Sequence, residues 1–306
     1  MYRLHANDPL ADDAMKLLED SEIFEISKGH YDKEELKENL DGIEFLVVRS
    51  ATKVTADVLS AGKDLKVIGR AGVGLDNVDV ETAKKLGIQV YNTPGANAIS
   101  VAELTMGLLL SLVRHIPRGT SGLKENLWEK KKLKGNEIYG KTLGLIGFGA
   151  IGKEVAKRAL AFGMKVLAYD PYVKKTELDV ELYDDMESML PKVDVLSLHV
   201  PLNNETKHII SKHELDLAKD GALVINAARG GVLDEQALYD AIISEKIKAA
   251  ALDVFEVEPP NDELRRKLLG LDNVIATPHI GASTVEGQVR VGVEMAKKLI
   301  EVGKKL

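Results

Sequence analysis

The sequence predicts an α/β protein of two doubly wound domains, each with a parallel sheet covered by helices on both faces. Short apolar runs alternate with longer segments of helical periodicity along the whole chain, and this alternation is typical of parallel sheets. The chain has 306 residues, of which 45% are hydrophobic, so it can bury a sizeable core. Because its length exceeds the usual range of a single core, we expect two domains.

The runs expected to form strands are short, apolar and bounded by turn residues. The first domain contains such runs at Ile43–Val48 and Lys66–Gly69. The second domain contains six more, with the sequences TLGLIG, KVLAYD, DVLSLH, ALVINA, AAALDV and NVIATP. Their regular alternation with helical segments predicts that the strands of each sheet run parallel.

Two helical segments are distinctive. After turn residues at Asn92–Asn97, the chain becomes helical and strongly apolar around Leu104–Val113. This apolar stretch is too short to span a bilayer, so we expect a buried helix. The segment from about Val285 to Leu306 is expected to be one amphipathic helix that needs a partner surface. Its common apolar face comprises Val289, Val293, Ala296 and Ile300.

Charge and composition exclude several classes of function. The chain has 41 basic and 48 acidic residues, so its net charge of −7 disfavours nucleic acid and anionic membranes as partners. It has no cysteine, which excludes disulfides, thiolate metal sites and cysteine nucleophiles, and we expect no metal. The first residues, MYRLHANDPLADDA, do not resemble a signal or transit peptide. The expected location is therefore cytoplasmic.

A glycine motif predicts a dinucleotide site. The strand TLGLIG leads into Gly147, Gly149 and Gly152, and a helix with a regular apolar face follows. The first glycine permits a tight turn, the second lets the backbone approach a pyrophosphate, and the third lets the helix pack on the strand. Asp170 ends the next strand, 170 − 152 = 18 residues later, where its carboxylate can accept hydrogen bonds from ribose hydroxyls. These features favour NAD over NADP and a Rossmann-like domain over a merely structural glycine turn.

Three polar side chains follow three later strands. They are Arg229 in NAARGGVLDE, Glu258 in DVFEVEPP and His279 in TPHIGAST. The carboxyl ends of parallel strands face the ligand crevice, so these side chains should converge there. A histidine can move the proton of a hydroxyl group, a carboxylate can orient that histidine, and an arginine can hold a carboxylate or a carbonyl oxygen. Each of the three could alone be an ordinary loop residue, but together they indicate a catalytic set.

The sequence resembles the D-isomer-specific 2-hydroxyacid dehydrogenases and, within that family, the D-3-phosphoglycerate dehydrogenases. The resemblance covers nearly the whole chain, in family order and spacing. It rests on VVRSATKVTADVL, VIGRAGVGLDNVD, NTPGANAISVAELTMGLLL, GKTLGLIGFGAIGKEVAKRALAFGMKVLAYDPY, NAARGGVLDE, ALDVFEVEPP and TPHIGAST. It implies NAD-dependent oxidation of D-3-phosphoglycerate to 3-phosphohydroxypyruvate, the first step of phosphorylated serine biosynthesis.

The resemblance also implies a domain layout and a set of site residues. The substrate domain is expected to be discontinuous, residues 1–93 completed by 282–306, around an NAD-binding domain at 94–281. The catalytic set is Arg229, Glu258 and His279, with His279 as proton donor and acceptor. Expected cofactor contacts are Gly147, Gly149, Ala150, Ile151, Gly152, Asp170, Val200, Pro201, Ala227, Asp253, Gly281 and Ala282. Expected substrate contacts are Arg49, Ser50, Arg70, Val73, Gly74 and Asn97, with the backbone of Val73 and Gly74 at the substrate carboxylate.

Arg49 and Ser50 distinguish the possible substrates. They follow a strand and supply a charge and a hydroxyl group where a phosphate could lie, although Arg49 could instead form a salt bridge between domains. A glyoxylate or hydroxypyruvate reductase is the alternative enzyme, because the same catalytic set fits it. A non-enzymatic NADH-sensing corepressor of the same fold is a further alternative, for which a phosphate-binding arginine would be superfluous.

The sequence differs from many members of the family in two respects, and it also suggests a homodimer. Ala150 stands where many relatives have a basic residue that reaches the pyrophosphate, so part of the cofactor affinity would come from elsewhere. The chain resembles the short form without C-terminal regulatory domains, so feedback inhibition by serine is not expected. The apolar helix after Asn97 suggests a homodimer formed through the NAD-binding domain, against the alternative that it is simply buried within the chain.

Overall fold

The structure, a computed structural model, describes residues 1–306 and divides into two compact units. Unit 1 comprises Met1–Asn97 and Ala282–Leu306, and unit 2 comprises Ala98–Gly281. Each unit has one all-parallel sheet with helices on both faces, so the predicted fold class is confirmed. The chain changes unit after Asn97 and again after Gly281, compared with the expected changes after residues 93 and 281.

Unit 1 is built on a five-stranded sheet of order β2-β1-β3-β4-β5. The strands are β1 (Tyr2–Ala6), β2 (Phe24–Lys28), β3 (Phe45–Val48), β4 (Val67–Arg70) and β5 (Gln89–Tyr91). The helices are α1 (Asp12–Glu19), α2 (Lys33–Glu38), α3 (Ala56–Ala61), α4 (Val80–Lys85) and α12 (Val285–Gly303). All four residues of β3 are buried, as expected for a central strand covered on both faces.

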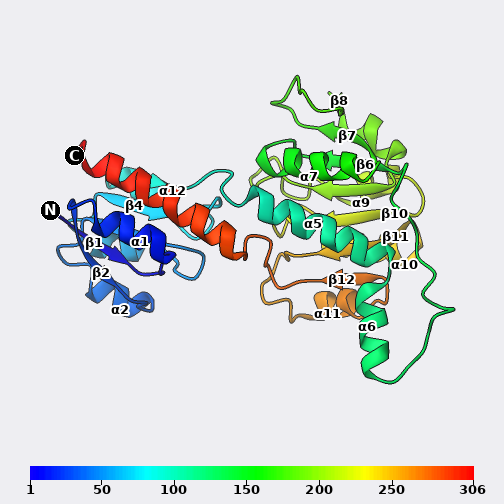
Figure 1. Cartoon of the computed structure of the whole chain (residues 1–306), viewed down its shortest axis with the longest axis horizontal. Helices are drawn as coiled ribbons and strands as arrows, with labels where there is room; N and C mark the ends of the chain where they lie inside the picture. Colours follow the sequence, from blue (N-terminus) through cyan, green and yellow to red (C-terminus); the bar gives the residue numbers. More distant parts are fainter. The chain divides into compact units, whose positions relative to one another are not determined.

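Helix α12 brings the end of the chain back to unit 1, where it lies beside α1 (Figure 1). Its extent matches the predicted amphipathic helix, but its buried stripe differs from the predicted face. Of the predicted face, Ala296 is fully buried, whereas Val289, Val293 and Ile300 are only partly buried. The other fully buried positions are Met295 and Leu299. The difference arises because α12 packs against both α1 and the sheet, which widens the apolar stripe.

Unit 2 is built on a seven-stranded sheet of order β12-β11-β10-β9-β6-β7-β8. Its strands are β6 (Thr142–Ile146), β7 (Lys165–Tyr169), β8 (Glu181–Tyr183), β9 (Val195–Leu198), β10 (Ala222–Asn226), β11 (Ile247–Leu252) and β12 (Val274–Ala276). The strand order reverses beside β6, since β7 and β8 lie on one side of it and β9 to β12 on the other. Ligands of doubly wound sheets bind at the carboxyl ends of the strands next to such a reversal.

Helices cover both faces of this sheet. They are α5 (Ala98–Val113), α6 (Ile116–Lys124), α7 (Ala150–Ala161), α8 (Met186–Met189), α9 (Lys212–Leu217), α10 (Glu235–Ile243) and α11 (Glu263–Leu269), with a short 3₁₀ helix at Leu190–Lys192. Helices α5 and α7 pack side by side on one face (Figure 1). Most apolar residues of α5 are buried in that layer, so burial within its own unit accounts for its composition.

No single helix has both the length and the hydropathy needed to cross a membrane. Helices α5 and α6 meet that test only when taken together, across a bend of 64°.

Candidate active site

The glycine motif forms the turn between β6 and α7, as predicted. Gly147 has φ +94°, and a Cβ atom there would lie 2.5 Å from the carbonyl oxygen of His199. A Cβ atom at Gly152 would lie 2.4 Å from the carbonyl oxygen of Gly147. Around Gly149, by contrast, no atom lies within 4 Å of a Cβ position. Two of the glycines therefore permit close packing, and the third leaves open space beside the turn.

The open space at Gly149 adjoins the N-terminus of α7. Gly149 is the N-cap of this helix and supplies no side-chain cap, so the first amide groups, including those of Ala150 and Ile151, have no intrahelical acceptor. Such amide groups and the helix dipole favour a phosphate group. The residues therefore fit the pyrophosphate of a dinucleotide through the backbone, without a basic side chain at position 150.

Asp170 follows β7 and is tied to the glycine turn. One of its carboxylate oxygens accepts the amide of Phe148 at 2.8 Å, and the other accepts the amide of Tyr172 at 2.9 Å. A carboxylate has about four acceptor positions, so both oxygens can still accept further hydrogen bonds. Asp170 thus fixes the turn and presents an acceptor next to it.

A buried histidine that the sequence analysis missed supports the same turn. His199 follows β9, and its amide donates to the carbonyl of Ile146 at 2.7 Å. Burial lowers the pKa of His199 to about 3, so the ring is neutral. Val200 and Pro201 come next, and Val200 packs against Gly147. The sequence feature that could have indicated His199 is its position at the end of a predicted strand, next to two predicted cofactor residues.

The catalytic candidates lie beyond three neighbouring strands. Arg229 follows β10, Glu258 follows β11 and His279 follows β12, and these strands are adjacent and parallel. The Nδ1–H of His279 donates to Oε2 of Glu258, with 2.8 Å between the atoms. Both side chains are partly exposed, at 49% and 38%. Since a carboxylate only accepts hydrogen bonds, Nδ1 carries a proton and Nε2 is left for a substrate.

The loop with Arg229 packs directly on the loop with Glu258. A Cβ atom at Gly230 would lie 1.9 Å from the carbonyl oxygen of Phe255, so only glycine permits this approach. Asn226 holds the Arg229 loop from the inside: its amide nitrogen donates to the Arg229 carbonyl at 3.0 Å, and its oxygen accepts the amide of Ala228 at 3.1 Å. Ala227, a predicted cofactor residue, is buried within this turn.

Asp253 has a clear structural partner in the turn that follows His279. Its buried carboxylate accepts the amide of Ile280 at 2.8 Å, the amide of Gly281 at 2.8 Å and the hydroxyl of Thr277 at 2.5 Å. The carbonyl of Asp253 also accepts the amide of His279 at 2.8 Å. Asp253 therefore positions the catalytic turn, while its contact with a cofactor stays a prediction, as do those of Gly281 and Ala282.

An ion network behind the Glu258 loop was not apparent from the sequence. Arg265 is buried and binds Glu235 at 2.6 Å and Glu256 at 2.9 Å. Burial is the largest influence on Glu235 and raises its pKa. The Glu235 carboxylate also accepts the amide of Glu256 at 2.8 Å. The network thus fixes the backbone two residues before Glu258, but no local motif indicates it.

The predicted substrate residues lie in unit 1. Arg49 directly follows β3 and Arg70 ends β4, and because these strands are neighbours both arginines lie at the carboxyl edge of that sheet. Ser50 is exposed next to Arg49. Val73 and Gly74 lie in the loop after β4, and the carbonyl of Val73 accepts the side chain of Asn92 at 2.6 Å. Asn97 is the last residue of unit 1 before α5.

A cavity of about 550 Å³ in unit 2 lies at the opposite edge of the sheet. Its lining includes Lys141, Asp194 and Ala222, which precede or begin strands, and none of the predicted site residues. This cavity is therefore not the candidate active site, whose side chains lie at the carboxyl ends of the strands.

Comparisons with known proteins identify the family. Residues 106–281 match the family model of the D-isomer specific 2-hydroxyacid dehydrogenase, NAD binding domain. The chain is 59% identical over 300 residues to a hydroxypyruvate reductase from Thermotoga maritima, covering 98% of both chains. It is 52% identical over 305 residues to a D-3-phosphoglycerate dehydrogenase from Methanocaldococcus jannaschii, of which it spans only 57%.

A solved structure is consistent with this assignment. The D-lactate dehydrogenase from Aquifex aeolicus, complexed with NAD and lactic acid, superposes with a TM-score of 0.85 at 33% identity. The match covers 99% of this chain and 96% of that one. The chain therefore belongs to the D-isomer specific 2-hydroxyacid dehydrogenase family and is an oxidoreductase with an NAD-binding domain.

Proposed function

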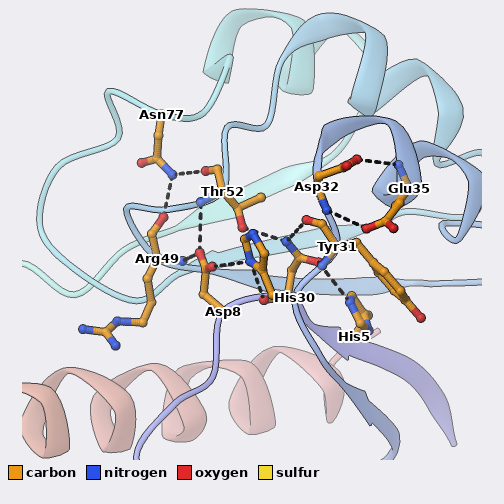
Figure 2. Close-up of polar contacts among 10 residues, drawn as sticks. His5, Asp8, His30, Tyr31, Asp32, Glu35, Arg49, Thr52 and Asn77 are labelled. Carbon is orange, nitrogen blue, oxygen red and sulfur yellow. Dashed lines mark hydrogen bonds and ion pairs between the residues drawn. The ribbon is translucent and has the colours of Figure 1, made fainter. Parts of the chain in front are cut away.

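We propose that this enzyme oxidises D-3-phosphoglycerate to 3-phosphohydroxypyruvate with NAD. This choice of substrate is supported mainly by the orientation of Arg49. Its side chain points away from the polar groups that hold its backbone (Figure 2). A guanidinium group placed in this way can bind a phosphate through charge-assisted hydrogen bonds, and the exposed Ser50, next in sequence, adds a hydroxyl group. The Arg49 backbone is fixed, so the charge is presented from a defined point of the sheet edge.

The side chains of unit 2 supply the proton chemistry. His279 accepts the proton of the substrate C2 hydroxyl at Nε2 during oxidation and returns it during reduction. Glu258 holds Nδ1 and stabilises the imidazolium that forms. Arg229 holds the substrate carboxylate or the C2 oxygen. NAD, when bound, supplies the hydride acceptor.

A hydroxypyruvate reductase is the second candidate, favoured by the 59% identity to the Thermotoga maritima protein over 98% of both chains. The oxoacids of the two reactions, 3-phosphohydroxypyruvate and hydroxypyruvate, share three carbons, a 2-oxo acid group and an oxygen at C3, and differ only by the phosphate. The catalytic set serves both reactions equally. The choice between them therefore depends on the residues of unit 1.

A specificity panel tests the proposed function. We would measure kcat/KM for D-3-phosphoglycerate, D-glycerate, D-lactate, hydroxypyruvate and glyoxylate, each with NAD(H) and NADP(H). The proposal requires phosphoglycerate to be the best hydroxyacid substrate and NAD the better cofactor. A preference for glyoxylate or hydroxypyruvate would move the assignment to the second candidate.

Asp170→Ala should weaken the binding of NAD and reduce the preference of the enzyme for NAD over NADP. The substitution removes a ribose acceptor and the repulsion of a 2′-phosphate. It also releases the amide of Phe148, so part of the loss will affect both cofactors. The ratio of kcat/KM for NAD and NADP isolates the specific effect, and an unchanged ratio would show that Asp170 acts only on the turn.

We further propose that the enzyme forms a homodimer through unit 2, though not through the face of α5 that the sequence suggested. That helix is buried in its own unit, whereas large apolar side chains are exposed on α6 and the loop after it. They are Ile116, Leu123, Leu127 and Trp128. Such a group of exposed apolar side chains is typical of an interface.

Light scattering at micromolar concentration should therefore give twice the 33.4 kDa mass of one chain. Trp128→Glu should shift the protein toward the monomer, because it places a charge among these apolar side chains. Tyr172→Glu is the matched control, since Tyr172 is 82% exposed and Trp128 is 81% exposed. A wild-type mass near that of one chain would refute the dimer.

A further inference from the structure

A cluster of polar side chains lies at the carboxyl edge of the unit 1 sheet, around the segment that follows β3 (Figure 2). We call residues 49–52, Arg49 to Thr52, the Arg49 loop. The cluster comes from three separate parts of the chain: the end of β1, the loop after β4 and the segment after β2. It holds the backbone of the Arg49 loop rather than its exposed side chains.

Asp8 binds the amide groups of the loop. The residue is 4% exposed, and one oxygen of its carboxylate accepts the amide of Arg49 at 2.6 Å and the amide of Thr52 at 3.2 Å. The other oxygen lies 3.3 Å from Nδ1 of His30. A buried carboxylate must be satisfied by donors, so its position and that of the two amides are mutually fixed.

Asn77 binds the carbonyl groups of the same loop. Its side-chain nitrogen donates to the carbonyl of Arg49 at 2.6 Å and to the carbonyl of Thr52 at 2.6 Å. Its side-chain oxygen accepts Nε of Arg70 at 3.2 Å. One amide side chain therefore connects both ends of the Arg49 loop with the second arginine at this edge of the sheet.

Asn7, which directly follows β1, completes the set. It donates to the hydroxyl of Thr52 at 2.7 Å and, through its side-chain oxygen, accepts the amide of Tyr31 at 3.0 Å. Asp8 and Asn77 thus fix the first and last peptide groups of the loop, and Asn7 fixes the side chain of Thr52. The guanidinium of Arg49 lies outside this network (Figure 2), and Ser50 is exposed. Fixed supports of this kind reduce the ordering cost of binding.

We propose that Asn77, together with Asp8, is a positioning residue for substrate recognition, which sets Arg49 and Arg70 in a fixed relation so that both can bind one substrate anion. Neither residue touches the substrate itself. The inference rests on the proposed function, because it takes Arg49 and Arg70 as substrate residues. It adds the reason why two flexible side chains can act as one recognition unit.

The test is a double-mutant cycle on KM. Asn77→Asp keeps the acceptor for Arg70 but places a carboxylate oxygen against two carbonyl groups, so the Arg49 loop should shift. We expect KM for D-3-phosphoglycerate to rise on the order of tenfold, with smaller changes in kcat and in KM for NAD. In the Arg49→Ala background the same substitution should raise KM by less than about twofold, because its effect acts through Arg49.

Control variants separate positioning from general damage to the fold. Asn39→Asp removes another amide-to-carbonyl hydrogen bond of unit 1, to Glu35, and should leave KM unchanged. Asp8→Asn disturbs the loop from its amide side and should reproduce the selective rise in KM, and it replaces Asn77→Asp if that variant does not fold. Thermal unfolding of all variants shows which of them are folded.

The cycle is measured on both D-3-phosphoglycerate and D-glycerate. Non-additive effects of Asn77→Asp and Arg49→Ala on either substrate support the positioning role, and multiplicative effects on both overturn it. If Arg49→Ala weakens the binding of the two substrates equally, Arg49 does not bind the phosphate and the proposed function fails. The coupling between Asn77→Asp and Arg49→Ala still shows whether Asn77 acts through Arg49. The failure of the inference and the failure of the proposed function are therefore distinguishable.

Discussion

His279→Ala should reduce kcat by about 10²–10⁴-fold while NADH binding remains nearly unchanged, because proton transfer by a positioned side chain contributes that much to the rate. In the structure the ring is oriented by Glu258 and by the Asp253 turn, and its Nε2 is left for the substrate. The substitution removes the proton acceptor but none of the backbone groups of the glycine turn.

Two measurements check this expectation. Steady-state kinetics give kcat, and titration of NADH fluorescence gives the dissociation constant of the cofactor. His213→Ala is the matched control, since His213 is also an exposed histidine beside a carboxylate, that of Glu187. A variant at position 279 with near-wild-type kcat would remove His279 from the catalytic set.

Arg49→Ala should raise KM for D-3-phosphoglycerate by roughly 10- to 150-fold, since a charge-assisted hydrogen bond contributes about 1.5–3 kcal/mol. D-Glycerate lacks the phosphate and should be little affected. The two substrates are compared in wild type and variant under the same conditions, and the difference between the two losses measures the contact with the phosphate.

Arg3→Ala serves as the control for loss of charge in unit 1. Its guanidinium is exposed and donates to the carbonyl of Asp41, which precedes β3, whereas the Arg49 loop follows that strand. KM values for both substrates should match those of the wild type. Equal losses on both substrates in Arg49→Ala would assign Arg49 to folding or domain closure and favour the hydroxypyruvate reductase.

The features that the sequence predicted well depend on local chemistry. The glycine turn could be located because Gly147 and Gly152 are each required by a contact within the same strand, turn and helix. The contact of Glu258 with His279 could be anticipated because the parallel strands before them end at one edge. Alternating apolar runs likewise predicted both sheets.

The features that it did not predict depend on contacts between distant segments. Asp8 lies 41 residues before Arg49 in the sequence, and nothing near Asp8 indicates that its carboxylate holds that loop. Arg265 looks like an ordinary charged residue of an amphipathic helix, yet it is buried against Glu235. The burial of α5 could not be distinguished from an interface, because composition does not show which surface covers an apolar helix.

We propose that this enzyme recognises the phosphate of its substrate. The most direct measurement compares the reduction of 3-phosphohydroxypyruvate and hydroxypyruvate with NADH, using one purified sample, because these oxoacids differ only in the phosphate. We predict a kcat/KM at least about tenfold higher for the phosphorylated substrate, as expected from one charge-assisted contact. An equal or higher kcat/KM for hydroxypyruvate would show that the enzyme does not recognise the phosphate.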